Sequence, residues 1–276
     1  MALAKELDLK AEAEGVEALA PLYGLPIPMK GTAAVVAFPS GAGVGILSGY
    51  VPVKDSALTE LIYARQGVVL GTTNTPEFAC SVNTANVASG QTRNPYDHRL
   101  SPGGSSGGAG SAVSMHMCPV AVSEDTGGST RVPALFNGLF GFDPARNHYP
   151  NEGNCGMSFT KDQLGVLSRS MEDLLFYDQA LLAGRHQADE LHSTWRQRCD
   201  ARPLESFKVG LPKRPWVVGG DRRLDATMQA AYEAVQRALH PVSLCEVDWE
   251  GPEATAVASQ EGPEKHVHMS RSESRL

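Results

Sequence analysis

The chain has 276 residues, of which 42% are hydrophobic and 20% charged, so it contains ample apolar material for a folded core. Its formal net charge is −7 and its Lys and Arg residues are not clustered, which argues against binding to nucleic acid, because phosphates require clustered cations. No apolar run approaches the roughly 20 residues that cross a bilayer, so we expect no membrane span.

The cysteines and the N-terminal residues bear on metals and on the compartment. The five Cys residues are widely spaced and form no CxxC pair, so we expect neither a zinc site nor a disulfide framework. Residues 1–19 carry acidic side chains and no long apolar segment, so we expect no secretory signal. Free thiols without a signal favour a reducing compartment, and we expect a cytoplasmic protein.

The N-terminal part of the chain predicts one helix and two short strands. Residues 2–20 have the pattern of an amphipathic helix. Residues 25–29 form a short apolar run that contains two prolines, so they can be a strand only at an edge or beside a loop. Residues 33–38 are apolar without such interruptions and predict a better strand.

A further helix and strand follow before residue 71. Asp55 is expected to cap a helix over residues 56–66, in which apolar side chains recur at helical spacing. Gly67 ends this helix, and residues 68–70 predict a buried strand. A strand, a helix and a strand in this order indicate an α/β fold.

The middle and C-terminal parts alternate in the same way. Residues 101–111 are too rich in glycine for a packed element, so we expect a loop there. Ser170, with Asp173 three positions later, predicts the start of a helix that reaches about residue 184. The remaining expected elements are a helix over 112–117, strands over 119–123, 207–211 and 242–247, and a helix over 222–239.

The composition changes after Trp249. Residues 250–276 have few large apolar side chains and no periodicity, so we expect a disordered tail. Residues 1–249 are then expected to form a single domain.

Two Gly/Ser segments stand out, GGSSGGAGS at 103–111 and DTGGSTRVPA at 125–134. Neither ends in the Gly-Lys-Ser/Thr of a phosphate-binding loop, and no GxGxxG follows a strand. Residues 103–107 match the GxSxG of α/β-hydrolases, but no buried strand precedes them and no suitable His follows. Residues 158–161, SFTK, match the SxxK of penicillin-recognising enzymes, but the companion motifs of those enzymes are absent.

Together the two segments resemble the amidase signature family of serine hydrolases. That family has a GGSSGG loop followed by a DTGGS turn, an arginine and Pro-Ala, and the spacing of Ser105 from Ser129 agrees with it. Further blocks are similar in order: LYGLPIPMKG at 22–31, DSALTELIYARQGVVLGTTNTPEFA at 55–79, NPYD at 94–97, and residues 149–181. The last block looks nearest to hydrolases of small aryl or indole acetamides.

The resemblance implies an α/β fold with a mixed central β-sheet covered by helices, the amidase signature fold. It also implies amide hydrolysis through a triad in which Lys30 acts on the nucleophile Ser129 through Ser105. An apolar surrounding would favour the neutral amine that Lys30 needs as a base. A cis peptide bond before Ser105 is implied as well.

The same resemblance assigns roles to the residues around the triad. The oxyanion hole would consist of backbone N–H groups of Thr126, Gly127, Gly128 and Ser129. Asp125, Arg131 and Ser106 would support the turn, with Asp125 and Arg131 as an ion pair. No metal or cofactor is needed, and the expected partner is a small-molecule amide substrate.

Three local departures and the length separate this chain from the family pattern. Gly31 follows the lysine where an acidic residue is common, DPARN stands at 143–147, and Glu124 stands where a small or neutral residue is usual. The chain is also shorter than family members, so we expect an incomplete sheet that a second copy or another partner covers. The alternatives are a catalytically inactive amidase-like fragment and an A-type component of a glutamine-dependent amidotransferase.

Overall fold

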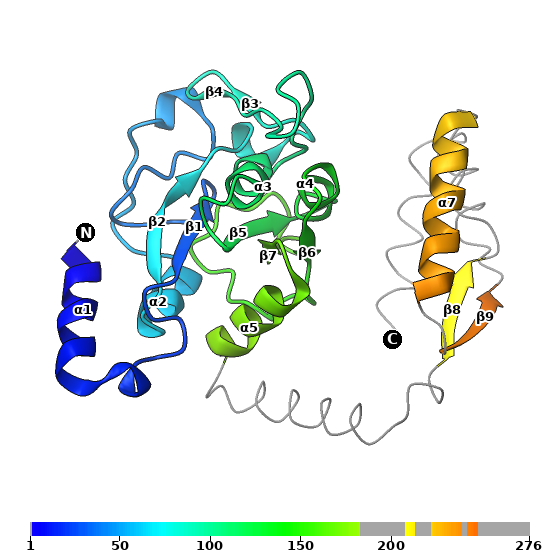
Figure 1. Ribbon diagram of the computed structural model, residues 1–276. Coiled ribbons are helices and arrows are strands. Elements are labelled where there is room, and N and C mark those ends of the chain that lie inside the picture. Colours follow the sequence, from blue (N-terminus) through cyan, green and yellow to red (C-terminus); the bar gives the residue numbers. More distant parts are fainter. Residues whose placement is uncertain (1, 183–207, 213–221, 239–241, 248–276) are drawn as a thin grey trace. The chain divides into compact units, whose positions relative to one another are not determined.

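The computed structural model describes residues 2–182, 208–212, 222–238 and 242–247 (Figure 1). The chain divides into two units, Met1–Ala188 and Asp189–Leu276. The expected tail at 250–276 lies outside the described residues.

The first unit begins with a helix and a parallel pair of strands. Helix α1 (Ala2–Glu14) ends before Gly15, whose positive φ of 83° breaks the longer helix that the pattern predicted, and a short 3-10 turn, η1 (Val16–Ala18), follows. Strand β1 (Pro26–Lys30) pairs in parallel with β2 (Val68–Thr73). Both apolar runs are therefore strands as predicted, but β2 is only partly buried, with Leu70 exposed.

The connection between β1 and β2 corrects two predictions. Residues 33–38 are not a strand: Ala33 makes one isolated bridge, and the neighbouring backbone bonds to the loop before α2 instead. Asp55 is not the N-cap of α2 (Ala57–Ala64), because its carboxylate accepts the Val36 N–H at 2.7 Å. The N-cap is Ser56, whose hydroxyl accepts the N–H of Thr59.

The glycine-rich segment is packed, contrary to the expectation of a loop over 101–111. Helix α3 (Gly107–Ser114) starts inside it, and Gly103 to Gly107 are all buried. Glycines without side chains let this segment approach other backbone closely, so a high glycine content here accompanies dense packing. The short elements before it are η2 (Gly45–Leu47), η3 (Glu77–Ala79), β3 (Ala85–Asn86) and β4 (Gly90–Gln91), the last two an antiparallel pair.

A three-stranded antiparallel sheet follows α3 (Figure 1). Its order is β5 (Val120–Asp125), β7 (Gln163–Ser168), β6 (Phe140–Phe142), with α4 (Arg131–Phe136) between β5 and β6 in the chain. Helix α5 (Met171–Leu182) leaves β7, and the Ser170 hydroxyl accepts the N–H of Asp173, which confirms the predicted N-cap. Sequence patterns predicted β5 but neither β6 nor β7.

Both faces of β5 are buried, and its residues alternate between two apolar clusters. Val120 and Val122 belong to the larger cluster, which also contains apolar residues of β1, α2, β7 and α5. Ala121 belongs to the smaller cluster with residues of α3 and α4. Figure 1 shows α3 and α4 on one side of this sheet and α5 on the other. Strand β1 also lies against β5, which brings the end of β1 next to the end of β5.

In the second unit, the described elements are β8 (Lys208–Pro212), α7 (Arg222–Ala238) and β9 (Ser243–Val247). The two strands pair in parallel, and all three elements lie within about a residue of their predicted positions. Among the helices that the structure describes, none is long and apolar enough to cross a membrane.

The close packing of α3 on the end of β2 gives a first prediction. A Cβ atom at Gly108 would lie 2.5 Å from the backbone oxygen and 2.6 Å from the backbone nitrogen of Asn74. Since backbone cannot move aside as a flexible side chain can, we expect Gly108→Ala to lower the free energy of unfolding by about 1–3 kcal/mol. Urea unfolding measures this.

Gly49→Ala is the matched control, because a Cβ there meets no atom within 4 Å and the residue is exposed. We expect its effect to stay within about 0.5 kcal/mol. Equal stabilities of the two variants would contradict the packing described for α3.

Candidate active site

Lys30 is the last residue of strand β1, and its side chain is completely buried, with 0% of its surface exposed. Its ammonium nitrogen lies 2.6 Å from the hydroxyl oxygen of Ser105, 2.6 Å from Oε2 of Glu124 and 3.1 Å from the backbone oxygen of Glu124. An ammonium group has three N–H donors and no acceptor. All three donors of a charged Lys30 are therefore satisfied inside the protein.

The surroundings of Lys30 act on its charge in opposite directions. Burial lowers the pKa of Lys30 below its ordinary value, and the negative charge of Glu124 only partly offsets this. Glu124 is itself 1% exposed, so the pair forms a buried ion pair. The structure thus supplies the burial that favours a neutral lysine, together with a carboxylate that opposes it.

Ser105 lies in a tightly constrained loop before α3. The peptide bond between Gly104 and Ser105 is cis. The Thr84 hydroxyl donates to the Gly103 carbonyl at 2.9 Å and accepts the Gly107 N–H at 3.0 Å, so it clamps the loop on both sides of Ser105. This clamp fixes the Ser105 hydroxyl toward Lys30.

Ser106 joins the loop to the end of β5. Its hydroxyl donates to the Glu124 carbonyl at 3.2 Å and accepts the Glu124 N–H at 3.3 Å, while its own N–H donates to the Ser129 carbonyl at 3.2 Å. The two Gly/Ser segments are therefore bound to each other, and Ser105 lies next to the turn that carries Ser129.

The turn after β5 is organised by the carboxylate of Asp125. That carboxylate accepts the N–H groups of Gly128 and Thr130, and Arg131 contacts both of its oxygens, at 3.0 and 3.2 Å. Burial alone would raise the pKa of Asp125, but the Arg131 guanidinium and these N–H donors outweigh burial and lower the pKa. The turn thus depends on an ionised Asp125.

Ser129 is half-buried in this turn. Within the described part of the chain, its hydroxyl makes no hydrogen bond, so the structure joins the side chains of Lys30 and Ser105 but links Ser129 to them only through the backbone. The Gly128 N–H is occupied by Asp125. The N–H groups of Gly127 and Ser129 have no acceptor among the described residues.

Two acidic residues at the site are not predicted as functional by the sequence. Glu124 stands out there only as a departure from the family pattern, and Asp162 belongs to the similar block after the signature without a role assigned to it. The Thr126 hydroxyl lies between them, 2.8 Å from Oε1 of Glu124 and 2.6 Å from Oδ1 of Asp162. The sequence offered one signal for Glu124: an acidic residue within an apolar strand indicates a buried carboxylate, and a buried carboxylate requires a partner.

The rival serine motif at 158–161 is built differently. Lys161 is exposed, and the Ser158 N–H donates to Asp162, so this pair lacks a buried lysine.

Among residues 2–182, 208–212, 222–238 and 242–247, no cluster of three His, Cys, Asp or Glu side chains could hold a metal ion.

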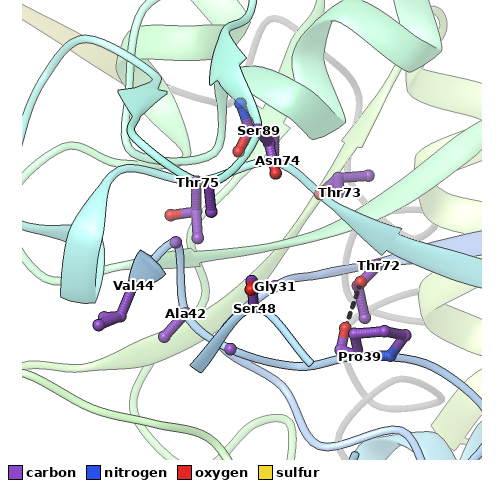
Figure 2. Close-up of a pocket in the computed structure, with 13 residues that line it drawn as sticks. Gly31, Pro39, Ala42, Val44, Ser48, Thr72, Thr73, Asn74, Thr75 and Ser89 are labelled. Carbon is purple, nitrogen blue, oxygen red and sulfur yellow. Dashed lines mark hydrogen bonds between the residues drawn. The ribbon is translucent and has the colours of Figure 1, made fainter. Parts of the chain in front are cut away.

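A polar pocket of about 270 Å³ lies beside the end of β2 (Figure 2). Gly31, the residue after Lys30, belongs to its wall, whereas Lys30, Ser105 and Ser129 do not. Figure 2 shows the bond that Thr72 donates to the Pro39 carbonyl at 2.7 Å, on one side of the pocket. Its other polar side chains are Ser48, Thr73, Asn74, Thr75 and Ser89.

Comparison with known proteins identifies relatives of this chain. The chain is 34% identical over 257 residues to the A component of the glutamyl-tRNA(Gln) amidotransferase of Burkholderia thailandensis, covering 87% of this chain and 52% of that protein. The corresponding protein of Maridesulfovibrio salexigens is 32% identical, with coverages of 83% and 47%. The chain spans about half the length of the curated relatives it matches.

Solved structures agree on the fold. The native peptide amidase of Stenotrophomonas maltophilia is 28% identical with a TM-score of 0.72, covering 89% of this chain and 52% of that one. A fatty acid amide hydrolase has a TM-score of 0.74 at 22% identity, with coverages of 90% and 44%, which supports the fold alone. The mixed α/β architecture predicted from the sequence is therefore confirmed as the amidase signature fold.

The family model described as Amidase matches residues 1–260, nearly the whole chain. With the relatives above, this match shows that the chain belongs to the amidase family.

Proposed function

We propose that the protein hydrolyses carboxylic amides, with Ser129 as nucleophile and Lys30 as base acting through Ser105. The observation that carries the proposal is the 2.6 Å contact between the buried Lys30 amine and the Ser105 hydroxyl, next to the turn of Ser129. A serine hydroxyl needs a base to become a nucleophile, and no histidine lies among the described partners of these groups.

Acylation requires Lys30 in its neutral form. The Ser129 oxygen attacks the amide carbon as its proton passes to the Ser105 oxygen, while the Ser105 proton passes to the lone pair of the Lys30 nitrogen. The C–N bond then breaks, and the proton returns through Ser105 to the departing nitrogen, so ammonia or an amine leaves. The products of this step are a neutral Lys30 and an ester on Ser129.

Deacylation repeats the same proton path with water. Water attacks the ester carbon, its proton passes through Ser105 to Lys30, and the proton then goes to the Ser129 oxygen as the C–O bond breaks. During both steps the carbonyl oxygen becomes negative, and the N–H groups of Gly127 and Ser129, which have no acceptor among the described residues, are the donors that we assign to it.

The identity of the substrate and of any partner is a separate proposal. The resemblance to hydrolases of small aryl acetamides favours a small neutral amide.

Strand β6 is an edge strand of the described three-stranded sheet, and Phe140 on it is exposed. We therefore propose that a second copy or another partner covers this edge. If the purified chain sediments only as a monomer, the proposal that a second copy covers this edge is contradicted.

A second candidate function follows from the identity to components of amidotransferases. At 34% identity to such a protein, the chain is a candidate for hydrolysing glutamine and passing ammonia to a partner. The net charge of −7 argues against direct contact with RNA by this chain. Release of ammonia from free glutamine, in preference to small aryl acetamides, would favour this candidate.

The triad is tested with a fluorophosphonate, which phosphonylates activated serines. We expect the label on Ser129, located by mass spectrometry, and none in Ser129→Ala. Lys30→Ala should slow labelling by about 10²–10⁴-fold, since it removes the general base. Ser158→Ala is the control and should leave the rate unchanged, because Ser158 belongs to the rival motif. A label on Ser158, or full labelling of Lys30→Ala, would sink the proposal.

The turn of Ser129 predicts a pH-dependent stability. Since the pKa of Asp125 is lowered in the folded state, its ion pair stabilises the protein above the unfolded pKa of about 3.9 and is lost as pH falls through the folded pKa. The free energy of unfolding in urea is measured from pH 7 to pH 3. At pH 7 we expect the wild type to be more stable than Asp125→Asn by about 1.5–3 kcal/mol, and we expect this difference to become smaller as the pH falls.

Asp143→Asn is the matched control for this experiment. Asp143 contacts the same guanidinium at 3.4 Å, but burial raises the pKa of Asp143. Replacing Asp143 therefore should not lower the stability at pH 7 in the way that replacing Asp125 does. If both variants show the same pH dependence, the assigned role of Asp125 is wrong.

A further inference from the structure

The partners of Lys30 are unusual in that one residue supplies two of them. The backbone oxygen and Oε2 of Glu124 both accept from the Lys30 nitrogen, and only the third contact goes to Ser105. Strand β5 places Glu124 on the same side as Val120 and Val122, because side chains alternate along a strand. The carboxylate thus points at the amine that the proposed mechanism uses.

This arrangement is compatible with two protonation states of Lys30. As an ammonium group, Lys30 donates to Glu124 twice and to Ser105 once. As a neutral amine, it keeps two N–H donors for Glu124 and directs its lone pair at the Ser105 hydroxyl, which then donates to it. Glu124 therefore orients the lone pair toward Ser105 and also stabilises the charged form that cannot act as a base.

We propose that Glu124 is a positioning residue for Lys30: its carboxylate holds the resting ammonium and sets the pH above which the Lys30 amine can take the Ser105 proton. The inference rests on the proposed amidase function for its catalytic meaning. The pairing itself rests on the contacts of Lys30 alone. As pH rises, the ammonium releases its proton to solvent and the amine becomes competent.

Other charged groups near the pair of Lys30 and Glu124 do not contact the Lys30 nitrogen. Thr126 separates Asp162 from Glu124, and because a hydroxyl has one proton, it can donate to only one of these carboxyl groups at a time. Among the described titratable groups, Asp125 on β5 also acts on Lys30 by its charge, and the charge of Glu124 acts on Asp143 after β6 and on Cys155 in the loop before Asp162. Among the described carboxylates, only that of Glu124 contacts the Lys30 nitrogen directly.

The test replaces the charge of Glu124 and keeps its shape. In Glu124→Gln the amide oxygen can accept from Lys30, and the amide N–H₂ can donate to Thr126. The rate of Ser129 labelling by a fluorophosphonate is measured against pH for the full chain. We expect the acid-side midpoint to move about one to three pH units lower in Glu124→Gln, because the charged lysine loses its counterion.

Asp162→Asn is the matched control, since it removes a carboxylate that bonds to Thr126 and not to Lys30, and whose charge raises the pKa of Lys30 less than that of Glu124 does. Its midpoint should move less than that of Glu124→Gln. An unchanged or raised midpoint in folded Glu124→Gln, or an equal shift in both variants, would overturn the role of Glu124. Circular dichroism and thermal unfolding establish that the variants are folded.

A second measurement does not depend on activity. The ¹³Cε resonance of Lys30, assigned by its loss in Lys30→Met, reports the protonation of the amine directly. We expect the same downward displacement in Glu124→Gln. If Ser129 is never labelled but the resonance shifts, the amidase proposal fails and the Glu124 pairing stands. If labelling occurs and neither midpoint moves, the amidase proposal stands and the role of Glu124 fails.

The wild-type protein decides the matter if Glu124→Gln does not fold. A Lys30 that is charged at pH 6 and releases its proton only at higher pH agrees with a resting ion pair. A Lys30 that is already neutral at pH 6 contradicts it.

Discussion

A fully buried amino group at the end of β1 imposes the main constraint on this structure. A charge without water must be matched by acceptors, and a missing acceptor costs several kcal/mol. The three acceptors of Lys30 come from β5 and from the loop before α3. The end of β1, the end of β5 and the Ser105 loop must therefore meet at one point, and the candidate site is part of the core itself.

The alternation along β5 connects this core to the turn that carries Ser129. Val120 and Val122 pack in the larger apolar cluster, and Glu124 continues the same face to Lys30. On the opposite face, Ser123 lies 2.8 Å from the hydroxyl of Thr130 and so holds the start of α4. Asp125 then leaves the strand and organises the turn of Ser129. One strand thus carries an apolar contact, a counterion and the anchor of the turn.

The chemistry that we propose uses a balance between burial and charge. Burial favours the neutral lysine that removes a proton, whereas the carboxylate of Glu124 favours the ammonium form. Neither influence alone gives both a stable fold and a usable base. An unpaired buried ammonium would destabilise the protein, and an exposed lysine would remain charged at neutral pH.

The sequence by itself predicted most local elements, and its resemblance to the amidase family pointed to the candidate triad. Apolar runs predicted β1, β2 and β5, Ser170 predicted the start of α5, and the two Gly/Ser segments indicated the amidase family. Local patterns failed where distant groups decide the structure: residues 33–38 bond to neighbouring loops, Asp55 accepts from Val36, and Gly103 and Gly104 are packed against backbone of other segments.

Only the tertiary structure decided that Glu124 is the counterion of Lys30, because the two residues lie 94 positions apart. The contact of Lys30 with Ser105 likewise spans 75 positions. Propensity and periodicity describe neighbours in the chain, whereas the partner of a buried charge is chosen by which strand ends the fold brings together.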